Sequence, residues 1–433
     1  ATLADYYSII DRYNNASRAN AYVGCPLSQP SRAALWSGLM PHQTNVRSNS
    51  AEHINPPLPD SIPTLGSLFT ANGYEAVHFG KTHDMGSLRG FRHKEPVAKP
   101  FTDPEFPVNN DSFLDVGTCE DAVAYLSNPP QEPFICIADF QNPHNICGYV
   151  GENKGEHIDS PISTPLPLLP ENFEVEDWEK LPLPIQYICC SHRRMMQAAH
   201  WNEDNYRHYV AAFQHYTRIV ARQIESVLEA LYSTPAGKNT IVIVLADHGD
   251  GMGSHRMVTK QVSFYEEMTN VPFIIAGPGI HPRQKPVEDL LTQPTIDLLP
   301  TLCELAGIPV PSSKPGISLA PFLKGEKQKR QHPYAASEWH SEYEVTVSPG
   351  RMIRSPRYKY THYLEGNGEE LYDMLKDKGE RRNLAHDPKY SKILAEHRAL
   401  LDDYIRRTQD DYRSLKVEAD KRWRSHAPGY PNH

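Results

Sequence analysis

A serine at the start of a predicted helix is the first residue whose type and position suggest chemistry. Two prolines and small polar residues fix a turn through Ser28 to Ser31, and the sequence from Arg32 to Trp36 continues as the first turns of a helix. A helix N-terminus presents free backbone N–H groups and positive potential, so an oxygen nucleophile placed there faces an anion site. Ser28 is therefore a candidate nucleophile, and Arg32 is a candidate both to brace the loop and to neutralise an anionic substrate or intermediate.

Further polar residues follow predicted strands, and open α/β sheets bind their ligands at the ends of such strands. After strands at 75–79, 134–140 and 240–246 stand, in that order, Lys81 with His83, then His144, then Asp247 with His248, His255 and Lys260. Side chains alternate along extended backbone, so Lys81 and His83 are predicted to point to the same side. Lys81 would bridge the nucleophile and an anionic oxygen, and His83 would orient or deprotonate the nucleophile. The alternative interpretation is that Lys81 and His83 are ordinary solvated residues of a surface loop.

The elements that must position these residues predict an α/β fold. The strands at 134–140 and 240–246 are continuous apolar runs, as a sheet buried on both faces requires. Between them, apolar residues from His208 to Tyr232 follow the spacing of an amphipathic helix. From about Tyr334 the pattern becomes a meander followed by a charged helix at 388–408. We therefore predict a catalytic α/β domain at 1–325 and a C-terminal subdomain at 326–433 with a small antiparallel sheet and a helix.

Composition excludes several classes of protein. The 433 residues carry a formal net charge of −9, which disfavours nucleic acid as a partner, and no apolar run is long enough to span a bilayer. Seven cysteines show no metal-binding spacing and do not settle the compartment. The sequence begins at Ala1 without Met, so we expect a mature or truncated chain. A periplasmic or secreted location is the expectation.

The segment Ser28-Gln29-Pro30-Ser31-Arg32, followed by Leu35 and Ser37-Gly38, closely resembles the signature of the type I sulfatases. These enzymes belong to the alkaline phosphatase superfamily, so the resemblance implies a large mixed, mostly parallel sheet flanked by helices. It also implies that a formylglycine-generating maturase oxidises Ser28 to formylglycine. Gly80-Lys81-x-His83, Pro143-His144 and Asp247-His248 with Lys260 resemble further elements of the family, in the same order.

The resemblance assigns a role to each candidate. The implied catalytic residues are Ser28, Arg32, Lys81, His83, His144 and Lys260; the implied metal ligands are Asp247 and His248; and substrate contacts are expected from His255 and Arg351. Calcium is the expected metal, with magnesium as the alternative, although an imidazole is a less typical ligand for calcium. The family's first strand ends in two adjacent aspartates, and no such pair precedes Ser28. Either that strand is missing from this sequence or the metal site is incomplete.

The mechanism implied by the resemblance depends on the hydrated aldehyde at position 28. One hydroxyl group attacks the sulfur of a sulfate ester, and the second expels sulfate afterwards, which an unmodified serine cannot do. The expected substrate is a sulfate ester or sulfamate of a glycosaminoglycan-type saccharide, such as a heparan-derived glucosamine unit, because the segment from Ser337 to Arg354 resembles sulfatases that act on such units. Two alternatives remain open, a phosphonate or phosphodiester hydrolase of the same superfamily and an inactive glycan-binding homologue.

Overall fold

The core of the molecule is a mixed sheet in two halves. The computed structural model describes residues 16–49, 56–101, 110–159, 162, 165–174, 180–191, 193–260, 263–282, 291–326, 332–342 and 346–417. In one half, β3 (Glu75–Gly80) pairs in parallel with both β4 (Arg92–Lys94) and β5 (Phe134–Asp139). In the other, β8 (Phe273–Ala276) pairs antiparallel with β6 (Val242–Leu245) and β1 (Ser17–Arg18). The predicted mixed α/β architecture is confirmed.

A third small sheet connects the start of the described chain to its later parts. Its central strand β2 (Asn20–Tyr22) pairs antiparallel with β7 (Asn270–Val271) and parallel with β9 (Leu291–Thr292). Since β2 runs directly into the segment before Ser28, this pairing fixes the start of the signature against residues about 250 positions later.

A cavity of about 2280 Å³ lies between the two half-sheets, lined by β5 on one side and β6 on the other. Side chains along both strands are only half-buried, whereas those of β8 are fully buried. The two predicted strands are confirmed. Within the part of the chain that the structure describes, no strand lies between β5 and β6.

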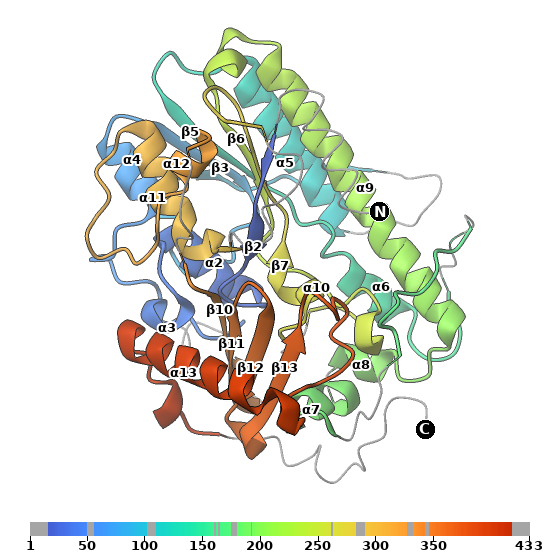
Figure 1. Cartoon of the computed structure of the whole chain (residues 1–433). Coiled ribbons are helices and arrows are strands. Elements are labelled where there is room, and N and C mark those ends of the chain that lie inside the picture. The colour runs from blue at the N-terminus through green and yellow to red at the C-terminus, as the bar shows by residue number, and fades with distance from the viewer. Residues whose placement is uncertain are drawn as a thin grey trace.

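Helices cover both faces of this sheet (Figure 1). The longest is α9 (Glu203–Tyr232), which begins where the Asn202 side chain accepts a hydrogen bond from the Asn205 N–H at 3.0 Å and packs against α5 (Asn110–Ser127). On the other side α2 (Ser28–Ser37) packs against α11 (Pro294–Ala306). The shorter helices are α3 (Pro41–Thr44), α4 (Leu65–Ala71), α6 (Ile146–Glu152), α7 (Leu183–Ser191), α8 (Arg193–Gln197), α10 (Glu266–Thr269) and α12 (Ala320–Leu323).

The C-terminal part forms the predicted antiparallel sheet and helix. Strands β10 (Ala335–Glu342), β11 (Thr346–Arg354), β12 (Tyr358–Tyr363) and β13 (Gly368–Asp373) pair in chain order, and α13 (Ser391–Thr408) packs against them (Figure 1). The Glu338 N–H of β10 donates to the Gly24 carbonyl at 2.7 Å, so this sheet also supports the segment that leads to Ser28. The domain boundary at 325/326 stays a prediction.

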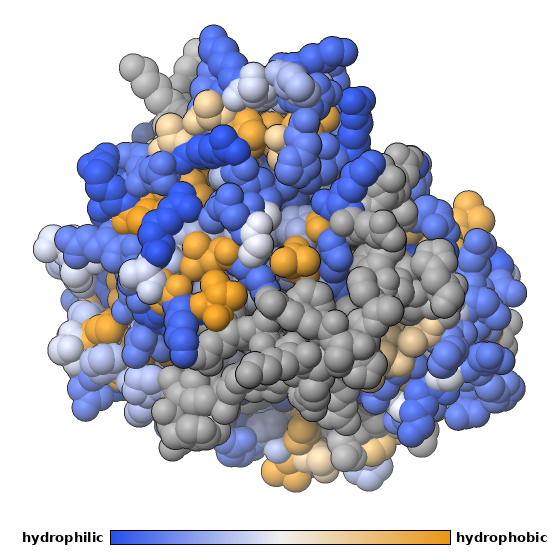
Figure 2. Space-filling view, turned by 90° about the horizontal axis from the view of Figure 1, so that it is seen from below, coloured by the Kyte–Doolittle hydropathy of each residue, from blue (hydrophilic) through white to orange (hydrophobic). Residues whose placement is uncertain are grey.

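On the face seen from below, most of the described residues at the surface are hydrophilic (Figure 2). Hydrophobic residues gather there only in small separate patches among hydrophilic ones. Among the described residues, no helix combines the length and apolar character needed to cross a membrane.

Candidate active site

Ser28 is the first residue of α2 and is completely buried. Two hydrogen bonds from the preceding and following backbone hold it there: the Gly24 N–H donates to Thr295 Oγ1 at 2.7 Å, and the Gln29 N–H donates to Asn49 Oδ1 at 2.8 Å. A side chain on Gly24 would lie only 2.8 Å from Thr295, so the close approach of α11 requires a glycine here. The predicted helix is confirmed, and it begins at Ser28, so the residues predicted as a turn form its first turn.

The Ser28 hydroxyl lies between an imidazole and an ammonium group. Ser28 Oγ is 2.7 Å from His248 Nε2 and 3.1 Å from Lys260 Nζ. His248 Nδ1 is 2.7 Å from the Gly249 carbonyl, which can only accept, so the proton of a neutral ring belongs on Nδ1. His248 Nε2 then accepts the hydrogen of Ser28 Oγ, and Lys260 donates to the same oxygen. This arrangement can withdraw a proton from Ser28 while a positive charge stabilises the oxygen.

His248 has an environment that keeps its ring neutral. Burial lowers the pKa of His248 to about 4, although the Asp247 carboxylate opposes this shift. The sequence prediction placed His248 at the metal and gave the role beside the nucleophile to His83. In the structure, it is the His248 ring that contacts Ser28.

Arg32 joins three strand ends to α2. Its guanidinium donates to the carbonyls of Lys81 and Thr82, each at 2.7 Å, and forms an ion pair with Asp139 at the end of β5. Its NH1 group also lies 3.6 Å from Asp247 Oδ2, after β6. Burial disfavours the charge on Arg32, but these two carboxylates outweigh burial and raise its pKa. Arg32 therefore acts first as a brace of the site, and its charge is already shared with Asp139.

Lys81 lines the cavity, whereas His83, two residues further on, is exposed and is not among the residues that line it. Burial lowers the pKa of Lys81, and the nearby charges of Lys260 and Arg32 add to the effect. For His83, partial desolvation by the surrounding protein and the three cations Lys81, Lys260 and Arg32 lower the pKa to about 4. The ring of His83 is therefore neutral at physiological pH, consistent with accepting or relaying a proton and not with pairing to an anion as a cation.

Asp247 is a buried carboxylate among these cations. Burial alone would raise its pKa, but His248, Lys81, Arg32 and Lys260 together hold the pKa well below the usual range. Its Oδ2 atom is buried and accepts no hydrogen bond. A buried carboxylate oxygen in this state is a suitable ligand for a cation.

The described residues alone do not fit a calcium ion. Calcium takes about six to eight oxygen ligands, whereas Asp247 offers one carboxylate, and the oxygens of Asp139 already pair with Arg32 and His78. His248 has both ring nitrogens engaged, one with Ser28 and the other with the Gly249 carbonyl. The prediction of His248 as a metal ligand therefore disagrees with this arrangement, and we derive no step through a metal.

His144 and His255 have different surroundings. His144 follows the cis Asn142–Pro143 bond after β5 and lines the cavity that Lys81, Asp247 and Lys260 also line. His255 is 4% exposed, and its ring stacks on Tyr265 with the centroids 3.9 Å apart. The expectation that His255 contacts the substrate is corrected: its ring is packed inside the protein and does not line the cavity.

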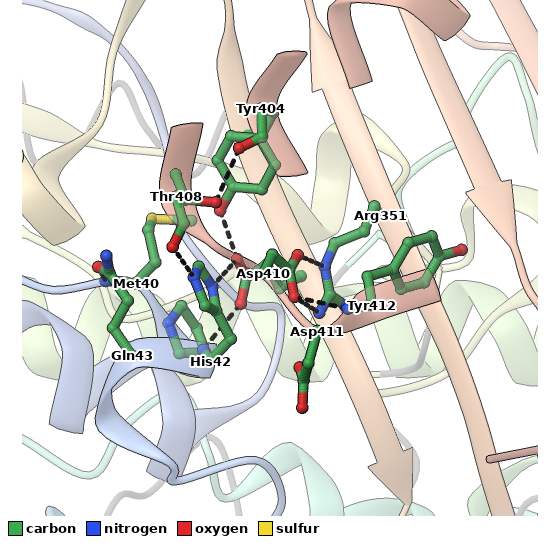
Figure 3. A network of polar contacts seen from close by, with 12 residues as sticks. Met40, His42, Gln43, Arg351, Tyr404, Thr408, Asp410, Asp411 and Tyr412 are labelled. Atoms are coloured by element: carbon green, nitrogen blue, oxygen red, sulfur yellow. Dashed lines mark hydrogen bonds and ion pairs between the residues drawn. The ribbon is translucent and has the colours of Figure 1, made fainter. Parts of the chain in front are cut away.

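Arg351 also departs from the prediction. It lies in β11 and donates from Nε and NH2 to the two oxygens of Asp410, at 2.7 and 2.9 Å (Figure 3). Its NH1 group donates to the Trp339 carbonyl. It is 2% exposed and belongs to a network that includes His42 and Glu338. The expected substrate contact is therefore corrected to a structural ion pair.

That network contains the group of His42, Glu338 and Asp410, whose ligand atoms lie within 4.8 Å of one another. A metal ion is not needed there, because Glu338 already accepts hydrogen bonds from His42 and Tyr404. Asp410 likewise accepts two from Arg351 (Figure 3). The buried negative charges are balanced by protein cations.

Sequence reasoning missed Asp139 and His78. Asp139 was read only as part of a buried strand, yet it accepts hydrogen bonds from Arg32 and from His78 Nε2, the latter at 3.3 Å. His78 is fully buried in β3, and its Nδ1 lies 2.9 Å from His93 Nδ1 in β4. The available signal was an ionisable residue inside each of two apolar strands, because such residues are rarely buried without a partner.

Comparisons with families, with curated relatives and with solved structures all find sulfatases. A family model described as "Sulfatase" matches residues 10–308, and one described as "N-sulphoglucosamine sulphohydrolase, C-terminal" matches residues 253–407. The Delta 4,5-hexuronate-2-O-sulfatase of Bacteroides thetaiotaomicron is 79% identical over 415 residues, covering 96% of this chain and 86% of the relative. The solved structure of a 2-O GAG sulfatase is 77% identical with a TM-score of 0.95, covering 98% of this chain and 92% of that one. A phosphonate monoester hydrolase of Agrobacterium radiobacter shares the fold at 20% identity, with a TM-score of 0.74 and coverage of 94% and 92%.

Proposed function

The chain belongs to the sulfatase family, and from this premise we propose that it hydrolyses the 2-O-sulfate ester of a Δ4,5-unsaturated hexuronate in a glycosaminoglycan-derived saccharide. The predicted family and the predicted sulfuric ester hydrolase acting on a sulfated sugar are confirmed. The hexuronate replaces the glucosamine unit expected from the sequence. The choice of a hexuronate is supported by the 79% identity to a relative named as a Delta 4,5-hexuronate-2-O-sulfatase.

One observation carries the chemistry: Ser28 Oγ lies 2.7 Å from His248 Nε2 and 3.1 Å from Lys260 Nζ. A sulfuryl group bound at this oxygen would place its negative oxygens beside the ammonium groups of Lys260 and Lys81, which line the same cavity. His248 accepts the proton that the nucleophile loses. Arg32 keeps the ends of β3, β5 and β6 together around that oxygen.

His144 is the candidate for the leaving group. It lines the cavity that the Ser28 cluster adjoins, and it comes from a loop different from the one that carries His248. A protonated imidazole at that place would supply a proton to the departing sugar oxygen.

Membership of the family implies a metal and formylglycine in general. We infer that Ser28 is the residue converted to formylglycine, because it occupies the first position of the signature and its hydroxyl contacts His248 and Lys260. Once formed and hydrated, the aldehyde would supply two hydroxyl groups at residue 28, one to attack the sulfur and one to allow the release of sulfate. A maturase is the partner that this conversion requires.

The proposal is tested with purified disaccharides. The full chain should release sulfate from one carrying a 2-O-sulfated unsaturated hexuronate, and the Ser28→Ala variant should release none. Disaccharides sulfated only on glucosamine and an aryl phosphodiester are the comparison substrates. Faster turnover of either comparison substrate would overturn the assignment. Mass spectrometry of the peptide containing Ser28 separately tests the conversion, which makes the residue lighter than serine by two hydrogens.

A further inference from the structure

A tyrosine of α9 links two points of the loop that carries both His248 and Lys260. The Tyr209 hydroxyl donates to Asp250 Oδ1 at 2.6 Å and accepts from the Thr259 N–H at 2.8 Å. Asp250 is two residues after His248, and Thr259 immediately precedes Lys260. One hydroxyl group therefore connects the two ends of the loop whose side chains contact Ser28.

The loop needs such support because its backbone is unfavourable. Met252, His255, Arg256 and Thr259 all have positive φ angles, of 50°, 51°, 55° and 58°. Side chains other than glycine rarely adopt this conformation, and it persists only where the surroundings hold it in place. Within the loop, the Gly251 N–H donates to the Thr259 carbonyl and the Gly253 N–H to the Met257 carbonyl, each at 3.0 Å.

The position of Tyr209 is itself well defined. The residue is completely buried, and its ring lies against Trp201 with the centroids 5.8 Å apart. It belongs to α9, a 30-residue helix that packs against α5 and α6. The hydroxyl is thus fixed by a rigid element that lies outside the loop.

We infer that Tyr209 is a positioning residue: its hydroxyl group holds His248 and Lys260 at the separation that places them on either side of Ser28 Oγ. The inference rests on the proposed function, since it assigns a role within the same site. Tyr209 itself touches neither the reacting atoms nor Ser28. Its effect passes through Asp250 on one side and the Thr259 backbone on the other.

Tyr209→Phe is the direct test because it removes one oxygen and keeps the ring. Tyr206→Phe is the matched control: Tyr206 lies on the same helix, is 1% exposed, and donates to the Arg256 carbonyl in the middle of the same loop at 3.0 Å. Both variants lose one buried hydroxyl, so a similar decrease in melting temperature is expected. For Tyr209→Phe we expect kcat to fall by about tenfold to a hundredfold, since a misplacement of about 1 Å has effects of that order, with KM changed much less. Tyr206→Phe should retain kcat.

A double variant tests whether the effect passes through Lys260. If Tyr209 acts partly by placing this ammonium group, the Tyr209→Phe change should lower kcat less in the Lys260→Met background than in the unmodified protein, and the remaining loss is the part that passes through His248. Additive losses in kcat would overturn the inference, as would equal losses in the Tyr209→Phe and Tyr206→Phe variants.

A measurement without turnover keeps this inference separate from the proposed function. The full-length proteins are treated with acetic anhydride, and modification of Lys260 is followed by peptide mass spectrometry. Faster modification of Lys260 in Tyr209→Phe, but not in Tyr206→Phe, supports the positioning role even if the sulfated hexuronate is not the substrate. Unchanged modification of Lys260 in Tyr209→Phe contradicts it whatever the substrate is.

Discussion

Arg32 of α2 forms a buried ion pair with Asp139, the last residue of β5, although 107 positions separate them in the sequence. The same carboxylate accepts from His78 of β3. Asp139 thus neutralises the Arg32 guanidinium, and the Arg32 NH1 group also lies 3.6 Å from Asp247 Oδ2. The charge and the hydrogen-bond donors of Arg32 are therefore already paired with protein groups before a substrate binds.

Replacing Asp139 by asparagine should damage both stability and activity. The variant keeps the shape but leaves the Arg32 charge without its main partner, and removing one member of a buried pair costs about 3 kcal/mol or more. We expect a lower free energy of unfolding by urea titration and a lower kcat, because Arg32 also holds the Lys81 and Thr82 carbonyls. Asp60→Asn, which removes an exposed partner of Arg89, is the control and should leave both quantities unchanged. A stable, fully active Asp139→Asn protein would refute the bracing role.

Lys260→Met should lower kcat without unfolding the protein. The Lys260 ammonium group donates to Ser28 Oγ at 3.1 Å, and removing one charge-stabilising donor from an active site typically lowers kcat by about a hundredfold to a thousandfold. Steady-state kinetics on the sulfated disaccharide measure the change, and Lys324→Met on the exposed end of α12 serves as the control. A loss confined to KM would instead indicate that Lys260 only attracts the substrate.

Arg351→Lys should reduce stability and leave the KM for the sulfated saccharide unchanged. Lysine keeps the charge but cannot donate to both oxygens of Asp410 and to the Trp339 carbonyl at once, so a loss of about 1.5–3 kcal/mol is expected, the contribution of a hydrogen bond to a charged group. Urea unfolding and kinetics on the same preparation separate the two effects. An increase in KM at unchanged stability would restore the substrate-binding role that the sequence suggested.

The sequence allowed good predictions where a residue type and its local backbone determine the outcome. Ser28 at a helix start and Asp247 after an apolar strand follow from patterns a few residues long, and the amphipathic spacing predicts α9 within five residues at its start. A local pattern could single out Asp139 as an ionisable residue in an apolar strand, but neither its partner nor that of Tyr209 could be found in this way, because both partners lie more than 40 residues away. Periodicity marks only the face of an element, and it does not say which distant group meets that face.

The errors have a similar origin. Arg351 was expected over the active face because its segment resembled one in other enzymes, but in β11 its side chain points to Asp410, which follows α13. His248, and not His83, contacts Ser28, because both histidines follow a strand and only the folded loops decide which ring reaches the nucleophile.

The stability of the C-terminal sheet should depend on pH through His42 and Glu338. Burial disfavours the charge on His42, but Glu338, 2.6 Å from its Nδ1, outweighs burial and raises the pKa of His42 above 6.5. Burial would raise the pKa of Glu338, but His42 and Arg351 lower it from 4.5 to about 2. A raised histidine pKa stabilises the fold fully below pH 6.5 and loses this effect as the pH rises through the raised value. The lowered Glu338 pKa stabilises the fold above pH 4.5, and the effect is lost as the pH falls toward about 2.

Between these limits, the melting temperature of the unmodified chain should exceed that of His42→Gln most clearly, and the difference should shrink on the alkaline side. His157→Gln, at a side chain that is 87% exposed, should show no such dependence. If the difference between the unmodified chain and His42→Gln grows as the pH rises above 6.5, the charged form of His42 is not the one that the fold holds.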